Sequence, residues 1–153
     1  MDIREDDLRG PEIIRLLETH LAHMHSITPI ESAHALDLDG LRHPSVTFWT
    51  VWDGDALAGC GALKELDRSH AEIKSMHTAA AFRGRGVAAL LVDHILKTAQ
   101  ERGYSRLSLE TGVTEHFAAA QALYRKFGFE KTGPFSTYRE DPHSLFMTKE
   151  LVG

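Results

Sequence analysis

The chain has 153 residues, which is enough for one domain with a substantial core and too few for two ordinary domains, so we expect a single domain over residues 1–153. Hydrophobic residues make up 42% and charged residues 25% of the chain, which excludes a mostly disordered protein, and the formal charge of −5 argues against a general nucleic-acid binder. No apolar run approaches the roughly 20 residues that cross a bilayer, and the acidic residues 1–7 lack the apolar core of a secretory signal, so the expected location is cytoplasmic.

A long helix is predicted over residues 11–26, after a short strand at residues 2–4, because apolar side chains repeat there at helical spacing. The helix carries His20, His23 and His25. His20 and His23 share a face at a spacing of three, but His25 is rotated away from both, and no cysteine or carboxylate set completes a metal site. We expect histidines that are solvated or line a substrate site, and no bound metal.

Three antiparallel strands are predicted next, after a short second helix with flanking loops in residues 27–45. Residues 46–52 are dense in β-branched and aromatic side chains, and the turn Asp53-Gly54-Asp55 connects them to a second strand over residues 56–66. The third strand is expected at residues 71–78. Cys60 is the only cysteine, which excludes an intramolecular disulfide, and we interpret it as a small interior residue rather than a thioester-forming nucleophile.

Residues 72–91 form the stretch around which the rest is organised, since they predict a strand, a bend, a glycine loop and the start of a helix. Gly84 and Gly86 allow a tight turn and let backbone amides approach a ligand. The helix that follows directs its free N–H groups and the positive end of its dipole at the same place. Arg83 and Arg85 add full positive charge in an acidic protein. The stretch therefore predicts a binding site for a pyrophosphate.

Two other phosphate-binding loops make different demands. A Walker-type P-loop ends in Gly-Lys-Ser/Thr, whereas residues 86–88 are Gly-Val-Ala, which argues against nucleoside triphosphate hydrolysis. A dinucleotide fingerprint is a closer rival, because residues 84–89 match its glycine spacing and Glu110 follows at a suitable distance for a ribose. A Rossmann strand runs almost directly into its first glycine, however, and here residues 79–83 intervene. A dinucleotide-binding oxidoreductase is the less favoured alternative.

The remaining elements complete a crossover and the end of a sheet. A helix over residues 86–102 leads to a strand at residues 106–110, which is expected to lie parallel to the strand before the helix through a right-handed crossover. A second helix is predicted at residues 118–127. The last strands are expected at residues 129–132 and 144–150.

Two motifs resemble the GNAT superfamily of N-acetyltransferases. Residues 83–88, Arg-Gly-Arg-Gly-Val-Ala, match the acyl-coenzyme A loop of that superfamily, Gln/Arg-x-x-Gly-x-Gly/Ala, at every defined position. Residues 122–129, Ala-Leu-Tyr-Arg-Lys-Phe-Gly-Phe, resemble its Ala-Leu-Tyr-x-x-x-Gly-Phe segment, in the right order and spacing. Residues 59–64 and 133–135 also look like a branch of small bacterial members. The resemblance extends over essentially the whole chain.

The resemblance implies an α/β (α+β) fold, with a central mixed, mostly antiparallel twisted sheet of about six or seven strands, about four helices and a splayed parallel strand pair around the cofactor. It also implies the activity of an N-acetyltransferase. The co-substrate would be acetyl-CoA, and the acceptor would be the primary amine of a small metabolite or amino-acid-like molecule, which attacks directly in a ternary complex.

The coenzyme is expected along the third strand and the glycine loop. By resemblance, the backbone N–H of Met76 is the oxyanion donor, and the strand edge from Met76 to Thr78 pairs with the pantetheine arm. Strand alternation would place both side chains on the same face as Glu72. The candidate coenzyme-binding residues are Met76, His77, Thr78, Arg83, Gly84, Arg85, Gly86, Val87 and Ala88.

Tyr124 and Glu72 are the candidate catalytic residues. The resemblance implies that the Tyr124 hydroxyl points at the thioester sulfur and protonates the leaving thiolate, the alternative being a core aromatic. Glu72 would take a proton from the acceptor ammonium, directly or through water, and its alternative is a solvated strand residue. Glu65 and Glu110 are reserve candidates for the base.

The acceptor is expected across the sheet from the coenzyme, between residues 24–42 and residues 135–143. These segments offer charges of both signs, as an acceptor with an amine and a carboxylate requires, although solvated loop charges are an equal alternative. Arg139 is the preferred partner for the carboxylate. The candidate substrate-binding residues are His25, Glu31, Arg42, Tyr138 and Arg139.

One position departs from the superfamily pattern. Many members carry an asparagine seven residues before the motif tyrosine, and here Phe117 removes that side-chain hydrogen bond. An acyl-coenzyme A sensor that transfers nothing is therefore an alternative function, although the presence of Tyr124 and Glu72 favours an enzyme. No motif encodes the acceptor or the oligomeric state, which leaves a homodimer open.

Overall fold

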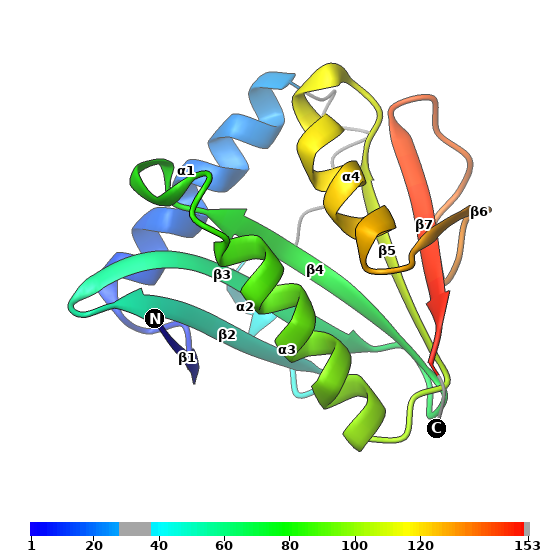
Figure 1. The fold of residues 1–153 in the computed structure, drawn as a ribbon, viewed down its shortest axis with the longest axis horizontal. Helices are drawn as coiled ribbons and strands as arrows, with labels where there is room; N and C mark the ends of the chain where they lie inside the picture. Colours follow the sequence, from blue (N-terminus) through cyan, green and yellow to red (C-terminus); the bar gives the residue numbers. More distant parts are fainter. Residues whose placement is uncertain (28–37, 152–153) are drawn as a thin grey trace.

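The structure is a computed structural model, which describes residues 1–27 and 38–151, with the backbone alone for residues 23–27, 38 and 116. A twisted sheet forms its centre (Figure 1). The described residues form seven strands in the order β1-β2-β3-β4-β5-β7-β6. All neighbouring strands are antiparallel except β4 and β5. In chain order the strands are β1 (Asp2–Glu5), β2 (Val46–Asp53), β3 (Ala56–Glu65), β4 (His70–Thr78), β5 (Arg106–Gly112), β6 (Glu130–Thr132) and β7 (Ser144–Glu150).

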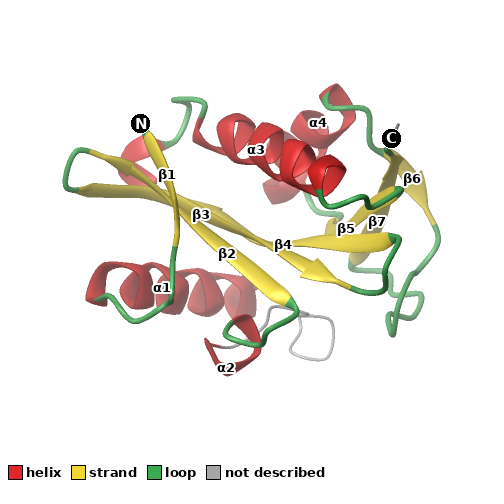
Figure 2. Ribbon diagram, turned by 90° about the horizontal axis from the view of Figure 1, so that it is seen from below, coloured by secondary structure: helices red, strands yellow, loops and turns green. Residues whose placement is uncertain are grey.

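Helices cover both faces of this sheet. Figure 2 shows α1 and α2 on one face and α3 and α4 on the other. Within the described part of the chain, no helix combines the length and the apolar character that a membrane span requires. The predicted fold class, with its mixed sheet and its helices, is confirmed. The helices are α1 (Pro11–Ile27), α2 (Leu38–Leu41), α3 (Val87–Glu101) and α4 (Ala118–Lys126), and the 3₁₀ turns η2 (Ala80–Phe82) and η3 (Glu115–Phe117) precede α3 and α4.

Strand β2 contributes side chains to the core on each face. Phe48 is buried with Ile13 and Leu17 of α1, whereas Trp49 is buried in the core beneath α3 and meets the ring of His94 edge-on at 5.2 Å. Neighbouring residues of a strand point to opposite faces, so one dense apolar segment fills both cores. Truncating a large side chain in such a core to alanine costs about 2–5 kcal/mol.

Strands β4 and β5 form the parallel pair that α3 connects. Their register runs from His70 opposite Arg106 to Ile73 opposite Leu109 and then ends. Both strands continue beyond this pair, but they diverge towards the upper part of Figure 1. Helix α4 lies in front of this upper part. The divergence opens a gap within the sheet, as predicted for a splayed parallel pair.

Ser75 interrupts the alternation of β4 just beyond the last parallel pair. Its φ is +56°, and the register with β3 shifts at the same place, which defines a bulge. Lys74 therefore shares a face with Glu72, whereas Met76 packs into the core near Leu91 of α3. The expectation that Met76 shares the face of Glu72 is wrong, because the extra residue of the bulge shifts the alternation by one position.

Cys60 fills the interior of β3. It has no exposed surface, and its Sγ donates to the carbonyl of Ser75 at 3.3 Å. Burial raises the pKa of the thiol to about 12, so the thiol is neutral at physiological pH. This environment fits the interpretation of Cys60 as a small interior residue and gives no support to a thioester-forming role.

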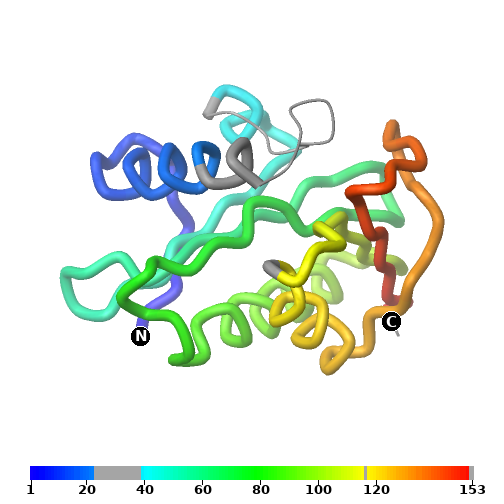
Figure 3. Tube along the Cα trace, turned by 90° about the horizontal axis from the view of Figure 1, so that it is seen from above, coloured from blue at the N-terminus to red at the C-terminus, as the bar shows by residue number. Residues whose placement is uncertain are grey.

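The loop of residues 133–143 covers the half of the sheet that α1 does not reach. It bends towards the α1 face of the sheet in both side views (Figure 2, Figure 3). The rings of Phe135 and Tyr138 lie 5.1 Å apart, and both contact Phe146 of β7, with centroid distances of 5.9 and 5.5 Å. The loop therefore holds an aromatic cluster against β7.

Candidate active site

The loop between η2 and α3 has the backbone that the sequence predicts. Gly84 and Gly86 have φ values of +76° and +80°, in the left-handed region that disfavours other residues. Gly86 is the N-cap of α3, and its carbonyl accepts a bond of 3.0 Å from the N–H of Leu90. The N–H groups of the first turn therefore stay available at the helix end. No atom lies within 4 Å of an added Cβ at either glycine, so the space beside the loop is open to a ligand.

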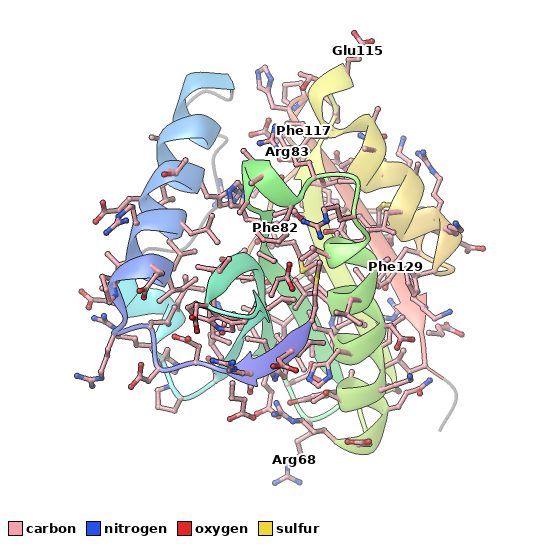
Figure 4. All side chains as sticks on the ribbon, turned by 60° about the vertical axis from the view of Figure 1, so that its left-hand side comes forward. Arg68, Phe82, Arg83, Glu115, Phe117 and Phe129 are labelled. Atoms are coloured by element: carbon pink, nitrogen blue, oxygen red, sulfur yellow. The ribbon has the colours of Figure 1, made fainter. Side chains whose placement is uncertain are left out.

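A groove of about 510 Å³ runs from this loop to β4 and α4. Figure 4 shows Phe82, Arg83 and Phe117, which come from η2, the glycine loop and η3 and line this groove. Apolar side chains make up most of the rest of its wall. The predicted coenzyme-binding residues that line it are Met76, His77, Thr78, Arg83, Gly84, Gly86, Val87 and Ala88.

Arg85 is the predicted coenzyme residue that points elsewhere. Its guanidinium lies 3.8 Å from the carboxylate of Asp53, at the tip of the β2–β3 hairpin, and 5.0 Å from the ring centroid of Phe82. Both charged side chains are about half exposed, and an ion pair of this kind contributes about 0–1 kcal/mol. Arg85 differs from the prediction because the hairpin, distant in sequence, brings a carboxylate to the loop. Arg83 is the loop arginine that faces the groove.

A second pocket, of about 130 Å³, lies where β4 and β5 diverge. Residues 74–76 of β4 and residues 110–112 of β5 line it from the two sides of the gap. The pocket and the groove share the residues His20, Met76, Phe117, Ala120 and Tyr124. The two cavities therefore meet around the motif tyrosine of α4.

Tyr124 is 7% exposed and belongs to the core, yet it borders both cavities. Its ring packs edge-on against Phe129, with centroids 5.9 Å apart. Burial, and secondarily the charge of Glu110, raises the pKa of the Tyr124 hydroxyl. The hydroxyl is therefore protonated at neutral pH and available to donate a proton at the junction of the cavities.

Glu72 and Lys74 form a buried ion pair beside Tyr138. The Lys74 ammonium donates to Glu72 Oε2 at 3.2 Å and to the Tyr138 hydroxyl at 2.7 Å, and that hydroxyl donates to the same Oε2 at 2.6 Å. Burial, followed by the charge of Glu72, raises the pKa of Tyr138 and keeps its hydroxyl a donor. Glu72 is 2% exposed, so the alternative of a solvated strand residue is wrong.

Glu110, a reserve candidate for the base, faces the same pocket from β5. Desolvation by burial raises its pKa to about 7. The hydroxyl of Ser144 and the charge of Lys74 oppose the rise, and the charges of Glu72 and Asp141 add to it. Both the protonated and the ionised form of the Glu110 carboxyl group are therefore accessible near neutral pH. A carboxyl group that titrates in this range inside a pocket is typical of acid–base chemistry.

Phe117 occupies the position where many superfamily members have asparagine. Its ring packs so closely on Gly112 that any Cβ there would clash. Gln121 Nε2 donates to the Gly112 carbonyl at 2.7 Å, which fastens α4 to the end of β5. Phe117 thus supplies an apolar wall between the cavities in place of a hydrogen-bond donor.

Among the predicted acceptor residues, Tyr138 is the one that lines the described part of this pocket. Arg42 is exposed, and its Nη2 donates to the carbonyl of Leu8 at 2.6 Å, close to the start of α1. Arg139 is exposed and does not line the described pocket. The side chain of His25 and all of Glu31 lie outside the described residues.

Three residues at the junction or in the pocket are absent from the candidate site residues predicted from the sequence, although His20 is noted there as solvated or substrate-lining and Phe117 as a departure from the superfamily pattern. His20 lies three positions after the buried Leu17, and its ring is 4.6 Å from that of His77. The sequence feature that points to His20 as a site residue is its place, as a polar residue, on the apolar face of a helix. Lys74 gives a similar signal, because it is charged within a central strand. Phe117 is noted in the sequence only as the residue in place of the superfamily asparagine, and nothing local indicates that its ring reaches Gly112.

The combined site suits the transfer of a group between two ligands. The groove offers backbone N–H groups for an anion, and the pocket offers a buried hydroxyl donor and a carboxyl group that titrates near neutral pH. Among the side chains that the structure describes, no group of three or more His, Cys, Asp or Glu is placed to hold a metal ion. This fold and site define the class of acyl-coenzyme A-dependent transferases.

The chain belongs to the GNAT family of acetyltransferases. The model of the acetyltransferase (GNAT) family matches residues 12–129. The Bacillus subtilis (strain 168) protein named uncharacterized N-acetyltransferase YsnE is 53% identical over 151 residues, which cover 99% of this chain and 100% of that protein. The Azospirillum brasilense protein named IAA acetyltransferase is 37% identical over 149 residues, which cover 97% of this chain and 95% of that protein. The prediction of an acyltransferase is confirmed, and the dinucleotide-binding oxidoreductase is wrong.

Solved structures have the same fold. A GNAT family acetyltransferase from Staphylococcus aureus Mu50 aligns with a TM-score of 0.75 at 21% identity, covering 99% of this chain and 100% of that one. A GNAT family acetyltransferase from Elizabethkingia anophelis with acetyl-CoA bound aligns with a TM-score of 0.69 at 18% identity, covering 98% and 97%.

Proposed function

We propose that the protein transfers the acetyl group of acetyl-CoA to the primary amine of a small acceptor, by direct attack while both molecules are bound. The observation that supports this most strongly is the meeting of two cavities at Tyr124. One cavity has a backbone suited to a pyrophosphate. The other carries charged and hydrogen-bonding side chains suited to an amine.

The groove would hold the coenzyme along its length. The N–H groups of the glycine loop and of the first turn of α3 would bind the pyrophosphate, with Arg83 adding charge, and the open space at Gly84 and Gly86 fits that group. Beyond the Ile73–Leu109 pair, β4 has no parallel partner in the described register. Its edge at residues 76–78 would therefore pair with the pantetheine arm. When bound, acetyl-CoA supplies the activated acetyl group.

Tyr124 would act at the junction of the cavities. Its hydroxyl is protonated and buried, so it suits donation of a proton to the sulfur that leaves the thioester. The backbone N–H of Met76, at the gap between β4 and β5, would bind the oxygen of the tetrahedral intermediate. Both groups come from elements fixed by core packing, which limits their reorganisation during the reaction.

The acceptor would enter the pocket next to Lys74, Glu72 and Tyr138. These side chains satisfy one another with three hydrogen bonds, so they form a rigid polar wall. Such a wall suits a small molecule that carries a second polar group beside its amine.

The test is release of coenzyme A thiol from acetyl-CoA in the presence of a panel of small primary amines and amino acids. IAA is tested separately from this panel, because a relative is named IAA acetyltransferase. We expect amine-dependent thiol release, with the N-acetylated product identified by mass spectrometry. Tight binding of acetyl-CoA without any amine-dependent release would instead support the sensor function.

A further inference from the structure

Glu110 occupies the first position of β5 beyond the paired part of the parallel strands. The last parallel pair joins Ile73 to Leu109, and Leu109 is buried in the core on the α3 side. Glu110 follows it and therefore points to the opposite face, where it lines the pocket at the gap between the strands. Tyr124 lines the same pocket from α4. The gap thus brings a carboxyl group and the candidate proton donor to one cavity from opposite sides of the sheet.

Glu72, the base predicted from the sequence, already accepts hydrogen bonds within a buried ion pair. Its Oε2 accepts hydrogen bonds from Lys74 and Tyr138, and both members of the ion pair are at most 7% exposed. Moving a proton onto Glu72 would leave the buried ammonium of Lys74 without its counterion, which is costly in a desolvated site. We therefore interpret Glu72 as the hydrogen-bond acceptor that orients Lys74 and Tyr138, and not as the proton acceptor.

We propose that Glu110 is the proton acceptor for the ammonium group of the acceptor, an inference that rests on the proposed acetyltransferase function. The groups that face or act on it are Lys74 and Glu72 from β4, Asp141 and Tyr138 from the loop of residues 133–143, Ser144 from β7, Tyr124 from α4 and His20 from α1. Lys74 is the one permanent cation in that described set, and its charge is already balanced by Glu72.

Glu110 and Tyr124 together account for every proton that moves in the reaction. The ammonium gives one proton to the Glu110 carboxylate and becomes a neutral amine, whose lone pair forms a bond to the thioester carbon. As the carbon–sulfur bond breaks, Tyr124 gives its proton to sulfur and takes the proton that the new amide nitrogen loses. The products are the N-acetyl compound and the free thiol, and protonated Glu110 returns its proton to solvent.

The experiment compares two acceptors across the pH range in wild-type protein and in Glu110→Gln. One acceptor is an alkylamine identified in the panel, and the other is its analogue with a trifluoromethyl group on the carbon that carries the amine, which lowers the pKa of the ammonium group so far that the amine is already unprotonated at neutral pH. With the alkylamine, wild-type kcat/KM should rise up to about pH 7 and then level off, whereas kcat/KM of Glu110→Gln should show no inflection there, should follow only the fraction of free amine and should be about 100-fold lower at pH 7.5. With the fluorinated amine, both proteins should show a flat profile and rates within about threefold, since no proton needs to be removed before attack.

Controls separate the outcomes. Glu130→Gln changes an exposed carboxylate on β6, outside both cavities, and should leave both profiles unchanged. A Glu110→Gln protein that keeps the inflection near pH 7 with the alkylamine would overturn the role of Glu110. If that variant fails to fold, the two wild-type profiles decide, because an identical rise with both amines contradicts the proposal. Failure of the wild type to acetylate any amine would instead overturn the proposed function itself.

Discussion

The groove proposed for the coenzyme and the pocket proposed for the acceptor are built in different ways, although they meet at Tyr124. One wall of the groove is one continuous segment, the end of β4, the glycine loop and the start of α3, and side chains of α1, η3 and α4 complete it. The groups proposed to bind the pyrophosphate there are mostly backbone N–H groups, whose direction is fixed by two positive φ angles and a helix start. The pocket depends on side chains from β4, β5, α1, α4 and the loop of residues 133–143.

Because the groove relies on backbone groups and the pocket on side chains, different kinds of substitution should impair the two sites. A backbone site tolerates changes of side chain except where a glycine is needed, whereas a side-chain site is altered by the loss of a single hydroxyl or charge. The groove should therefore lose function mainly through its glycines. The pocket should lose it through residues such as Tyr138, Lys74 and Glu110.

The largest effect is expected for Gly86→Asp. The substitution adds a negative charge to the anion site and disturbs two or three charge-assisted hydrogen bonds, worth about 4 kcal/mol together, so affinity for acetyl-CoA should fall about 1000-fold in calorimetry. Gly103→Asp is the matched control, because Gly103 also has a positive φ and open space at its Cβ but lies at the other end of α3. Equal affinities of the two variants would show that the glycine loop does not hold the coenzyme.

The next effect concerns the stability of the pocket. The pKa of Glu110 rises from its ordinary value of 4.5 to about 7 in the folded protein, so its ionisation opposes folding as the pH rises through this range. Glu110→Gln should leave stability unchanged at pH 4 and increase it by about 3 kcal/mol at pH 8. Urea unfolding at both pH values measures this, with Glu130→Gln as the exposed control. A gain that is the same at both pH values would mean that Glu110 is not desolvated.

Tyr124→Phe tests the junction of the two regions. Loss of the hydroxyl should lower turnover about 100-fold while acetyl-CoA affinity changes by less than about threefold, because the ring and its contact with Phe129 are kept. Tyr104→Phe removes a buried hydroxyl that donates to Glu65 away from both cavities and should leave turnover unchanged. Wild-type turnover of Tyr124→Phe, with chemistry limiting the rate, would make Tyr124 a core residue alone.

Two neighbouring residues sharpen the description of the pocket wall. Tyr138→Phe removes the hydroxyl that joins Glu72 to Lys74, so KM for the acceptor should rise about tenfold with the coenzyme affinity intact. Arg139→Gln changes an exposed side chain outside the described pocket and should change the same KM by less than about twofold. If Arg139→Gln has the larger effect, the carboxylate partner predicted from the sequence is correct and the pocket wall is misassigned.

The groove is built largely from a local segment and the pocket from distant ones, which explains which features could be predicted from the sequence. The hairpin, the crossover helix and the glycine loop are local patterns, so their places follow from residue spacing. The bulge at Ser75 is not local, because it depends on the register with β3, and it moves Met76 to the other face of β4. The pairing of Lys74 with Tyr138 joins residues 64 positions apart, and no spacing rule predicts it.

The pattern of initial rates with both substrates varied tests the central claim most directly. Since the groove and the pocket meet at Tyr124, the acetyl donor and the amine can be bound together, and plots of reciprocal rate should intersect as acetyl-CoA is varied at several amine concentrations. No acetylated protein should form when the amine is left out. Parallel lines, together with an acetyl group on the protein in mass spectrometry, would contradict direct transfer between two adjoining sites.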